Sequence, residues 1–281
     1  MWTQKETLTS RQNPTVKKIF ALSEKKERRR EGLFRFDGVK LFGEAIGCGL
    51  RIRYVIVRED AAASVVDAVE SAIAHGALSC DSVIRVSEGV FSKLSEERAP
   101  EGIITVAEFI EERHRMLGAS ECDTYSAGAD ERLLIAESLR DPGNLGTVIR
   151  SCAALGIDRL IISDDCADLY SPKTIRGAMG GIFRLNIDVV PQRAMPSAIL
   201  SLRASGRRVF AAALHKDAEI IGELELRHGD CFVIGNEGHG LTDDTVGACD
   251  ACALIPMREG SESLNAAAAA SICIWETVRV K

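Results

Sequence analysis

No long apolar run occurs in this sequence, and that excludes a class of proteins. None of the 281 residues belongs to an uninterrupted hydrophobic segment of the ~18 to 20 residues that a membrane-spanning helix needs. The opening residues, MWTQKETLTSRQ, also lack the apolar core of a secretory signal. We therefore expect no membrane association and a location in the cytoplasm.

Phosphate-binding fingerprints and a complete zinc motif are missing as well. Neither GxGxxG nor GxxxxGK[ST] occurs, so NAD-binding and ATP-binding folds lose support. The nine cysteines are scattered singly through apolar segments, which favours reduced, buried thiols over a disulfide framework. Cys249 and Cys252 have CxxC spacing, but no second pair or histidine cluster completes a site, and we expect no metal.

The composition is that of a folded protein with an uneven distribution of charge. Hydrophobic residues make up 46% of the chain and charged residues 27%, and the length favours two domains. The net charge is −6, yet residues 1–40 contain eleven Lys or Arg against five Asp or Glu. Phosphate contacts need only a local basic surface, so the N-terminal end is a candidate site for nucleic acid.

The basic N-terminal segment has the pattern of one amphipathic helix. Asn13-Pro14 predicts its start and Gly32 its end, with Val16, Ile19 and Phe20 as a short apolar stripe. The cations that project elsewhere are predicted RNA contacts: Lys17, Lys18, Lys25, Lys26, Arg28, Arg29 and Arg30. A charged face that is merely solvated is the alternative explanation.

Strand and helix signals alternate along most of the chain, which is typical of α/β proteins. Residues 1–110 are predicted to form a small α/β domain, residues 111–130 a linker rich in turn-forming residues, and residues 131–281 a second α/β domain. Strands are predicted in the second domain at 133–136, 159–162, 185–189, 209–213, 232–234 and 253–255. Their alternation with helices predicts a mostly parallel sheet, whose carboxyl edge usually binds the ligand.

Three polar loops follow strands of that sheet and are expected to converge. DPGNLGT (residues 141–147) opens a helix that presents Arg150, an arrangement that suits an anion. GNEGHG (residues 235–240) describes a backbone bent closely around a ligand, with Glu237 at the end of the strand. Between its last two glycines, His239 is expected to be solvent-exposed and outside the site. Separately, each loop has a plain structural explanation, a βα turn or a glycine turn.

The third loop is IPMREGSESLN (residues 255–265), which leads into a predicted helix. Ser263 by itself would pass as the N-cap of that helix. Asn265 is then expected just inside the helix, where asparagine competes with the backbone for hydrogen bonds. An asparagine there, next to a run of alanines, predicts a specific partner for its side chain.

In this order and spacing, the three loops resemble the motifs of the SpoU (TrmH) branch of the SPOUT RNA methyltransferases: NLGTVIRSCAALGI, VIGNEGHGL and IPMREGSESLNAAAAASICIWE. The N-terminal half resembles the substrate-binding domain of that family, which is L30e-like, through NPTVKKIFALSEKKERRREGLFRFDGVKLFGEAI. The resemblance implies a C-terminal α/β domain with a mostly parallel sheet and a deep trefoil knot. It also implies S-adenosylmethionine as cofactor and a homodimer formed through this domain.

The resemblance assigns residues to the active site and to the cofactor. The active-site residues are Asn144, Arg150, Glu237, Ser263 and Asn265, and the cofactor-binding residues are Leu214, Gly235, Asn236, Gly238, Ile255, Met257 and Leu264. A guanidinium, with a pKa above ~12, is a reluctant base, so we expect Arg150 to hold the target phosphate. We expect Glu237 to orient Asn144 or Arg150, while Ser263 and Asn265 close the polar side of the pocket.

The implied activity is transfer of a methyl group to a ribose 2′-hydroxyl of RNA. An L30e-like domain favours 23S or other ribosomal RNA, because such domains bind folded RNA by shape and 2′-hydroxyl contacts. A tRNA 2′-O-methyltransferase and a non-catalytic RNA-binding assembly factor remain alternatives, although the presence of Arg150 and Asn265 opposes the second. Methylation of a base nitrogen is disfavoured by the SLN and NEG motifs, and an oxidoreductase by the missing phosphate fingerprint.

Overall fold

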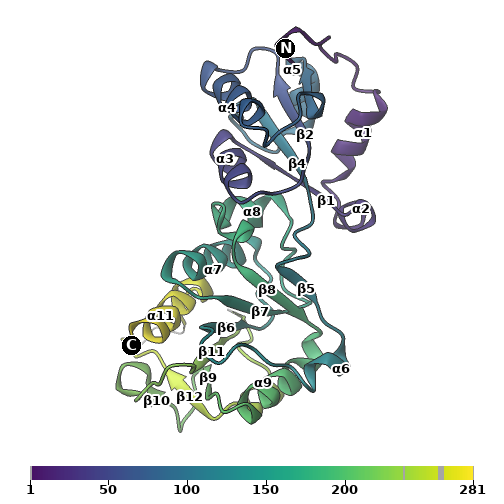
Figure 1. Cartoon of the computed structure of the whole chain (residues 1–281). Helices are drawn as coiled ribbons and strands as arrows, with labels where there is room; N and C mark the ends of the chain where they lie inside the picture. The colour runs from purple at the N-terminus through teal and green to yellow at the C-terminus, as the bar shows by residue number, and fades with distance from the viewer. Residues whose placement is uncertain (1, 237, 259–262, 281) are drawn as a thin grey trace. The chain divides into compact units, whose positions relative to one another are not determined.

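The computed structural model describes residues 2–236, 238–258 and 263–280, which form two compact units. The N-terminal unit consists of Met1–Ile110 with Tyr170–Phe183, and the C-terminal unit of Glu111–Leu169 with Arg184–Lys281. Each unit is an α/β structure built on a sheet of its own (Figure 1). Within the described ranges, none of the helices combines the length and the apolar character needed to span a bilayer.

The N-terminal unit contains a four-stranded sheet in the order β1 (Leu33–Asp37), β4 (Ile103–Glu108), β2 (Ile52–Arg58) and β3 (Val83–Val86). Strand β4 is antiparallel to both of its neighbours, whereas β2 and β3 are parallel. Helices α3 (Val39–Gly47) and α4 (Ala63–Ala74) cover one face, and α1 (Pro14–Ala21) and α5 (Glu88–Leu94) cover the other.

Alternation of side chains along β2 explains how one sheet serves two cores. Val55 and Val57 pack with Phe42 of α3, whereas Ile56 between them packs with Ile19 of α1. All five side chains are almost completely buried. Both faces of the sheet are therefore covered by helices.

The basic segment forms two helices where the sequence predicts one. Asn13 caps α1 as expected, and Gly32 ends α2 (Lys25–Glu31) in a left-handed conformation with φ +63°. Between the helices the chain turns, and the guanidinium of Arg28 donates hydrogen bonds to the carbonyls of Leu22 (2.7 Å) and Ser23 (2.6 Å). The prediction of an uninterrupted helix was therefore wrong, because Arg28 satisfies the backbone groups that a helix break leaves open.

A segment from the second half of the sequence belongs to the N-terminal unit. Tyr170–Phe183 contains the short helix α8 (Pro172–Ala178), and its aromatic ends pack on β1. The ring of Tyr170 lies 4.7 Å from that of Phe34, and the ring of Phe183 lies 5.2 Å from that of Phe36. The sequence predicts residues 131–281 as one domain, and the structure differs because Tyr170–Phe183 belongs to the N-terminal unit. Burial of these aromatic rings against β1 stabilises that arrangement.

The C-terminal unit contains an eight-stranded sheet in which every neighbouring pair is parallel. Its order is β10 (Glu219–Ile220), β12 (Ala251–Leu254), β9 (Val209–Ala212), β11 (Cys231–Ile234), β6 (Leu133–Ala136), β7 (Arg159–Ser163), β8 (Asn186–Val190) and β5 (His114–Met116). The six predicted strands are all present, with bounds shifted by no more than two residues. The predicted mostly parallel sheet is confirmed.

Helices cover both faces of this sheet (Figure 1). One face shares an apolar cluster with α6 (Ala119–Cys122), α9 (Met195–Ala204) and α10 (Asp243–Ala248). On the other face, α7 (Pro142–Leu155) and α11 (Ala266–Arg279) pack against each other. Helix α7 begins within the first motif loop and α11 begins immediately after the third, so the core also positions the site.

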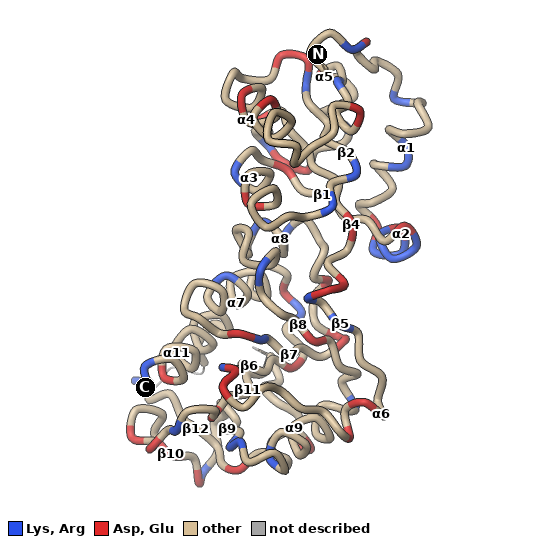
Figure 2. Tube along the Cα trace, in the orientation of Figure 1, with Lys and Arg blue, Asp and Glu red and all other residues tan. Residues whose placement is uncertain are grey.

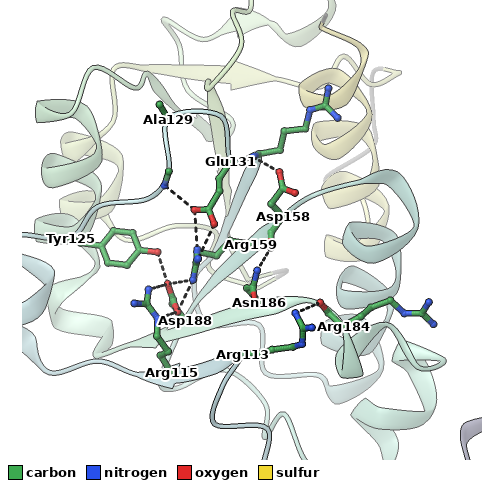
Figure 3. Close-up of polar contacts among 12 residues, drawn as sticks. Arg113, Arg115, Tyr125, Ala129, Glu131, Asp158, Arg159, Arg184, Asn186 and Asp188 are labelled. Carbon is green, nitrogen blue, oxygen red and sulfur yellow. Dashed lines mark hydrogen bonds and ion pairs between the residues drawn. The ribbon is translucent and has the colours of Figure 1, made fainter. Parts of the chain in front are cut away.

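Residues 111–130, which the sequence predicts to be a linker, are part of the C-terminal unit. Strand β5 pairs with β8, and a buried carboxylate holds the segment in place (Figure 3). Asp188 accepts hydrogen bonds from Arg115 (2.6 and 2.7 Å), from the hydroxyl of Tyr125 (2.6 Å) and from Arg159 (3.1 Å). Burial raises the pKa of Asp188, but these donors outweigh it and hold the pKa below its usual value.

Candidate active site

The three motif loops lie at one edge of the sheet in the C-terminal unit. They follow β6, β11 and β12; β6 and β11 are direct neighbours, and β9 lies between β11 and β12. Because these strands are parallel, their carboxyl ends meet at the same edge (Figure 1). The predicted convergence is confirmed by a side-chain hydrogen bond between the first and third loops and by a cavity shared by the second and third.

The cavity has a volume of about 540 Å³ and is formed by the segments that follow β9, β11 and β12. All seven predicted cofactor-binding residues line it: Leu214, Gly235, Asn236, Gly238, Ile255, Met257 and Leu264. His239 is exposed as expected, but it also lines this cavity. The prediction missed the neighbours Ala213 and Leu241, whose small or apolar side chains carry no chemical signal of their own.

Residues 235–236 and 238–242, here called the glycine loop, lie at the cavity and are joined by two backbone hydrogen bonds. The N–H of Asn236 donates to the carbonyl of Gly240 (3.1 Å), and the N–H of Gly240 donates to that of Asn236 (2.9 Å). A Cβ atom at position 235 would lie 2.4 Å from the carbonyl carbon of Gly240 and 2.6 Å from the nitrogen of Leu241. Only glycine fits at that position, as the sequence predicts for a closely bent backbone. Glu237 lies outside the described residues.

Asn265 links the third loop to the first. Its Nδ2 donates to the Oδ1 of Asn144 at 3.0 Å, and its Oδ1 accepts from the N–H groups of Ala267 (2.9 Å) and Ala268 (3.3 Å). Asn265 is therefore the N-cap of α11, and its expected position inside the helix was wrong. The expectation that it has a specific partner is confirmed. Ser263 lies two residues before the cap, where it lines the cavity.

Asn144 and Arg150 both lie on α7, and Asn144 contacts the third loop through Asn265. The helix begins at Pro142, and the side chain of Asp141 caps it by accepting from the N–H of Asn144 (2.9 Å). Arg150 is exposed and makes no hydrogen bond or ion pair to any residue that the structure describes. Neither Asn144 nor Arg150 is among the described residues that line the cavity. The structure thus brings Asn144 and Asn265 together and leaves Arg150 open to solvent.

The predicted RNA-binding cations are not equivalent in the structure. Arg28 is only 4% exposed and is occupied by backbone carbonyls, so its prediction as an RNA contact was wrong. Lys18 pairs with Glu31 at 2.7 Å, and Arg30 lies against both Glu27 and Glu31. The four others are exposed and have no hydrogen-bond or ion-pair partner in the described part of the chain: Lys17, Lys25, Lys26 and Arg29. Figure 2 shows the concentration of positive charge on α2.

Two family models match the chain. The model of the SpoU rRNA Methylase family matches residues 131–275, more than half of the chain, and that of the MRM3-like substrate binding domain matches residues 13–105. The first match contains all three loops of the site. The second contains the two basic helices.

Individual proteins agree with these matches. The 23S rRNA (guanosine(2553)-2'-O)-methyltransferase RlmP of Bacillus subtilis is 29% identical over 268 residues, which cover 95% of this chain and 97% of that protein. The 23S rRNA (uridine(2479)-2'-O)-methyltransferase of Streptomyces viridochromogenes is 30% identical over 203 residues, or 70% of this chain and 67% of that protein. An AdoMet-bound rRNA methyltransferase from Sinorhizobium meliloti superposes with a TM-score of 0.80 at 28% identity, covering 98% of this chain and 97% of that one. All three names describe rRNA methyltransferases.

Proposed function

Because the chain belongs to the SpoU rRNA methylase family, we propose that it transfers the methyl group of S-adenosylmethionine to a ribose 2′-hydroxyl of ribosomal RNA. Two similar proteins are named for this reaction on 23S rRNA. The observation that carries the proposal is the cavity next to the Asn144–Asn265 pair, because every residue that the family motifs assign to the cofactor lines it. The fold is that of the SPOUT methyltransferases, and its trefoil knot stays a prediction.

The residues of the cavity fit S-adenosylmethionine, which supplies a methyl group already activated by a sulfonium. A volume of about 540 Å³ falls within the range of ~300 to 1,000 Å³ that is usual for small-molecule sites. Leu214, Ile255 and Leu264 offer apolar surface. Lys and Arg are absent from its described lining, whereas Asp243 contributes a carboxylate, and this balance of charge favours a cationic ligand.

The chain's own polar residues then have to position the ribose and help to remove its proton. We assign Arg150 to a phosphate of the target nucleotide, because a planar guanidinium forms two parallel hydrogen bonds to such a group. Its exposure leaves it available for this contact. Asn144, Asn265 and Ser263 would border the reacting sugar, and the orienting role of Glu237 stays a prediction.

The assignment of Arg150 predicts a combined loss of binding and activity. Arg150→Ala is expected to weaken RNA binding and to lower kcat/KM at least about tenfold, as the loss of a charge-assisted hydrogen bond does. Filter binding and incorporation of labelled methyl groups measure the two effects. Arg227→Ala, which removes another exposed arginine of the same unit, is the control and should change neither. Wild-type RNA affinity and methylation in Arg150→Ala would contradict the assignment.

RNA binding is assigned chiefly to the N-terminal unit. Lys17, Lys25, Lys26 and Arg29 are exposed on α1 and α2, and their region matches the MRM3-like substrate binding domain. Neutralising backbone phosphates releases counterions, and this supports affinity for any folded RNA. The names of the similar proteins favour ribosomal RNA over tRNA as the substrate.

We also propose a homodimer formed through the C-terminal unit, and a cytoplasmic location. Trp275 on α11 is 57% exposed. Tryptophan is enriched in protein–protein interfaces, so an exposed tryptophan is a candidate interface residue. Leu155, at the end of the adjacent helix α7, is 37% exposed. Apolar side chains on two packed helices suit a self-complementary contact between two copies.

The reaction can be tested directly. The protein is incubated with labelled S-adenosylmethionine and separate pools of unmodified rRNA and tRNA, and the labelled RNA is digested with alkali. A 2′-O-methyl group makes the adjacent linkage resistant to alkali, so label is expected in resistant dinucleotides of rRNA. Label in tRNA would change the substrate, and label on a base, or in no RNA, would contradict the proposed activity.

A further inference from the structure

A buried carboxylate that the motifs do not include lies directly beneath the glycine loop. Glu137 follows the last residue of β6 and is only 1% exposed. It accepts four hydrogen bonds, to Oε1 from Gln192 Nε2 (3.1 Å), Thr242 Oγ1 (3.0 Å) and Thr245 Oγ1 (2.8 Å), and to Oε2 from the N–H of Thr242 (2.9 Å). A buried charge is costly unless hydrogen bonds compensate for its lost hydration, and neutral donors do so here.

Most of these donors belong to the end of the glycine loop and the start of α10. Thr242 is the last residue of the loop and the N-cap of α10. Its neighbours on both sides, Leu241 and Asp243, line the cavity. By binding both the backbone and the hydroxyl of Thr242, Glu137 therefore fixes the stretch of chain between two cavity-lining residues.

The next residue in the sequence holds the beginning of the same loop. The carbonyl of Ser138 accepts a hydrogen bond from Asn236 Nδ2 at 2.8 Å. Ser138 has φ +57°, a left-handed conformation that non-glycine residues seldom adopt and that surrounding contacts must maintain. Its N–H donates to Ser163 (2.7 Å) and its hydroxyl to Asp165 (2.7 Å). This anchored backbone turn aims the carbonyl at Asn236.

We propose that Glu137 and Ser138 form a clamp that sets the shape of the glycine loop before the cofactor binds. The two residues hold opposite ends of the loop, and the loop closes on itself between them through Asn236 and Gly240. Neither lines the cavity, so both are positioning residues. The inference rests on the proposed function for the identity of the ligand. A loop that is already ordered binds its ligand more tightly, because it loses less conformational entropy when the ligand binds.

The clamp is tested with Glu137→Gln, which keeps the volume of the side chain but places an NH₂ donor where acceptors are needed. In the cofactor-free protein, amide hydrogens of Gly240 and Thr242 should exchange at least about tenfold faster, the effect of losing a hydrogen bond to a charged group. The dissociation constant of S-adenosylhomocysteine, measured by calorimetry, should rise about as much. RNA affinity should stay at the wild-type value.

The matched control is Asp188→Asn, the same chemical change at another buried carboxylate of this unit, whose partners lie outside the cavity. Both variants should lower stability, because each disturbs a buried hydrogen-bond network, but only Glu137→Gln should loosen the loop. Equal effects of both variants, or wild-type exchange in Glu137→Gln, would overturn the clamp. If Glu137→Gln does not fold, Thr245→Val removes one of the four hydrogen bonds to Glu137 and should act in the same direction. Failure of the wild type to bind S-adenosylhomocysteine would instead contradict the proposed function, since exchange is measured without ligand.

Discussion

Gly235 shows how a single methyl group can decide the shape of a binding site. In Gly235→Ala, the new Cβ would lie 2.4 Å from the carbonyl carbon of Gly240. Because the clash is with backbone and not with a flexible side chain, it can be relieved only if the loop opens. Because the loop lies at the cavity, we expect the fold to persist and S-adenosylhomocysteine to bind at least about tenfold more weakly, the effect of losing about 1.4 kcal/mol. Calorimetry measures the affinity and circular dichroism the fold.

The control for this change is Gly222→Ala. Gly222 lies in the same unit, and a Cβ built there would meet no atom within 4 Å. Its affinity for S-adenosylhomocysteine should equal that of the wild type. If Gly235→Ala bound the ligand equally well, the tight backbone approach would have no part in forming the cavity.

Helix α11 combines a structural and a functional role in one side chain. Asn265→Asp keeps the acceptor that caps the helix but removes the donor that contacts Asn144. The melting temperature should stay close to wild type, since aspartate and asparagine cap helices about equally well, whereas methylation should fall about tenfold or more. Asn265→Ala should lose activity and about 1 kcal/mol of stability as well. Full activity in Asn265→Asp would show that the hydrogen bond to Asn144 is not needed for catalysis.

Helix α2 offers a test of RNA binding that depends on salt. A variant with Lys25→Ala, Lys26→Ala and Arg29→Ala loses three exposed cations that have no partner among the described residues. Its RNA affinity should fall. A plot of the logarithm of the association constant against the logarithm of the salt concentration should also become shallower, by about 1 in slope for each lost phosphate contact. Arg30→Ala is the control, because Glu27 and Glu31 already neutralise this residue. An unchanged slope in the triple variant would show that these three cations of α2 do not contact RNA phosphates.

In the proposed homodimer, the second copy of the chain would cover the exposed side chain of Trp275 on α11. Trp275→Glu places a charge on this face and should convert a dimer into a monomer, because burying an unpaired carboxylate costs several kcal/mol. Light scattering coupled to size-exclusion chromatography measures the mass. Leu200→Glu, at a residue 51% exposed on α9, should leave the dimer intact. A dimeric Trp275→Glu variant would place the interface on another surface.

Local patterns were sufficient for most of the site. The strand that precedes each loop, the glycine at position 235 and the cap at Asn13 depend on residues close in sequence, and the structure agrees with each of them. The seven cofactor residues came from the family resemblance and line one cavity. Such features are predictable because a loop after a parallel strand must lie at the carboxyl edge of its sheet.

Sequence alone determined the α/β class, the mostly parallel sheet and the three loops that meet at its edge, since periodicity and short motifs specify these. Only the tertiary structure decided that Arg28 is buried, that Tyr170–Phe183 joins the N-terminal unit and that Glu137 holds Thr242. The physical reason is the distance along the chain: Glu137 and Thr242 are 105 residues apart, and no local pattern contains both a buried acceptor and its donors.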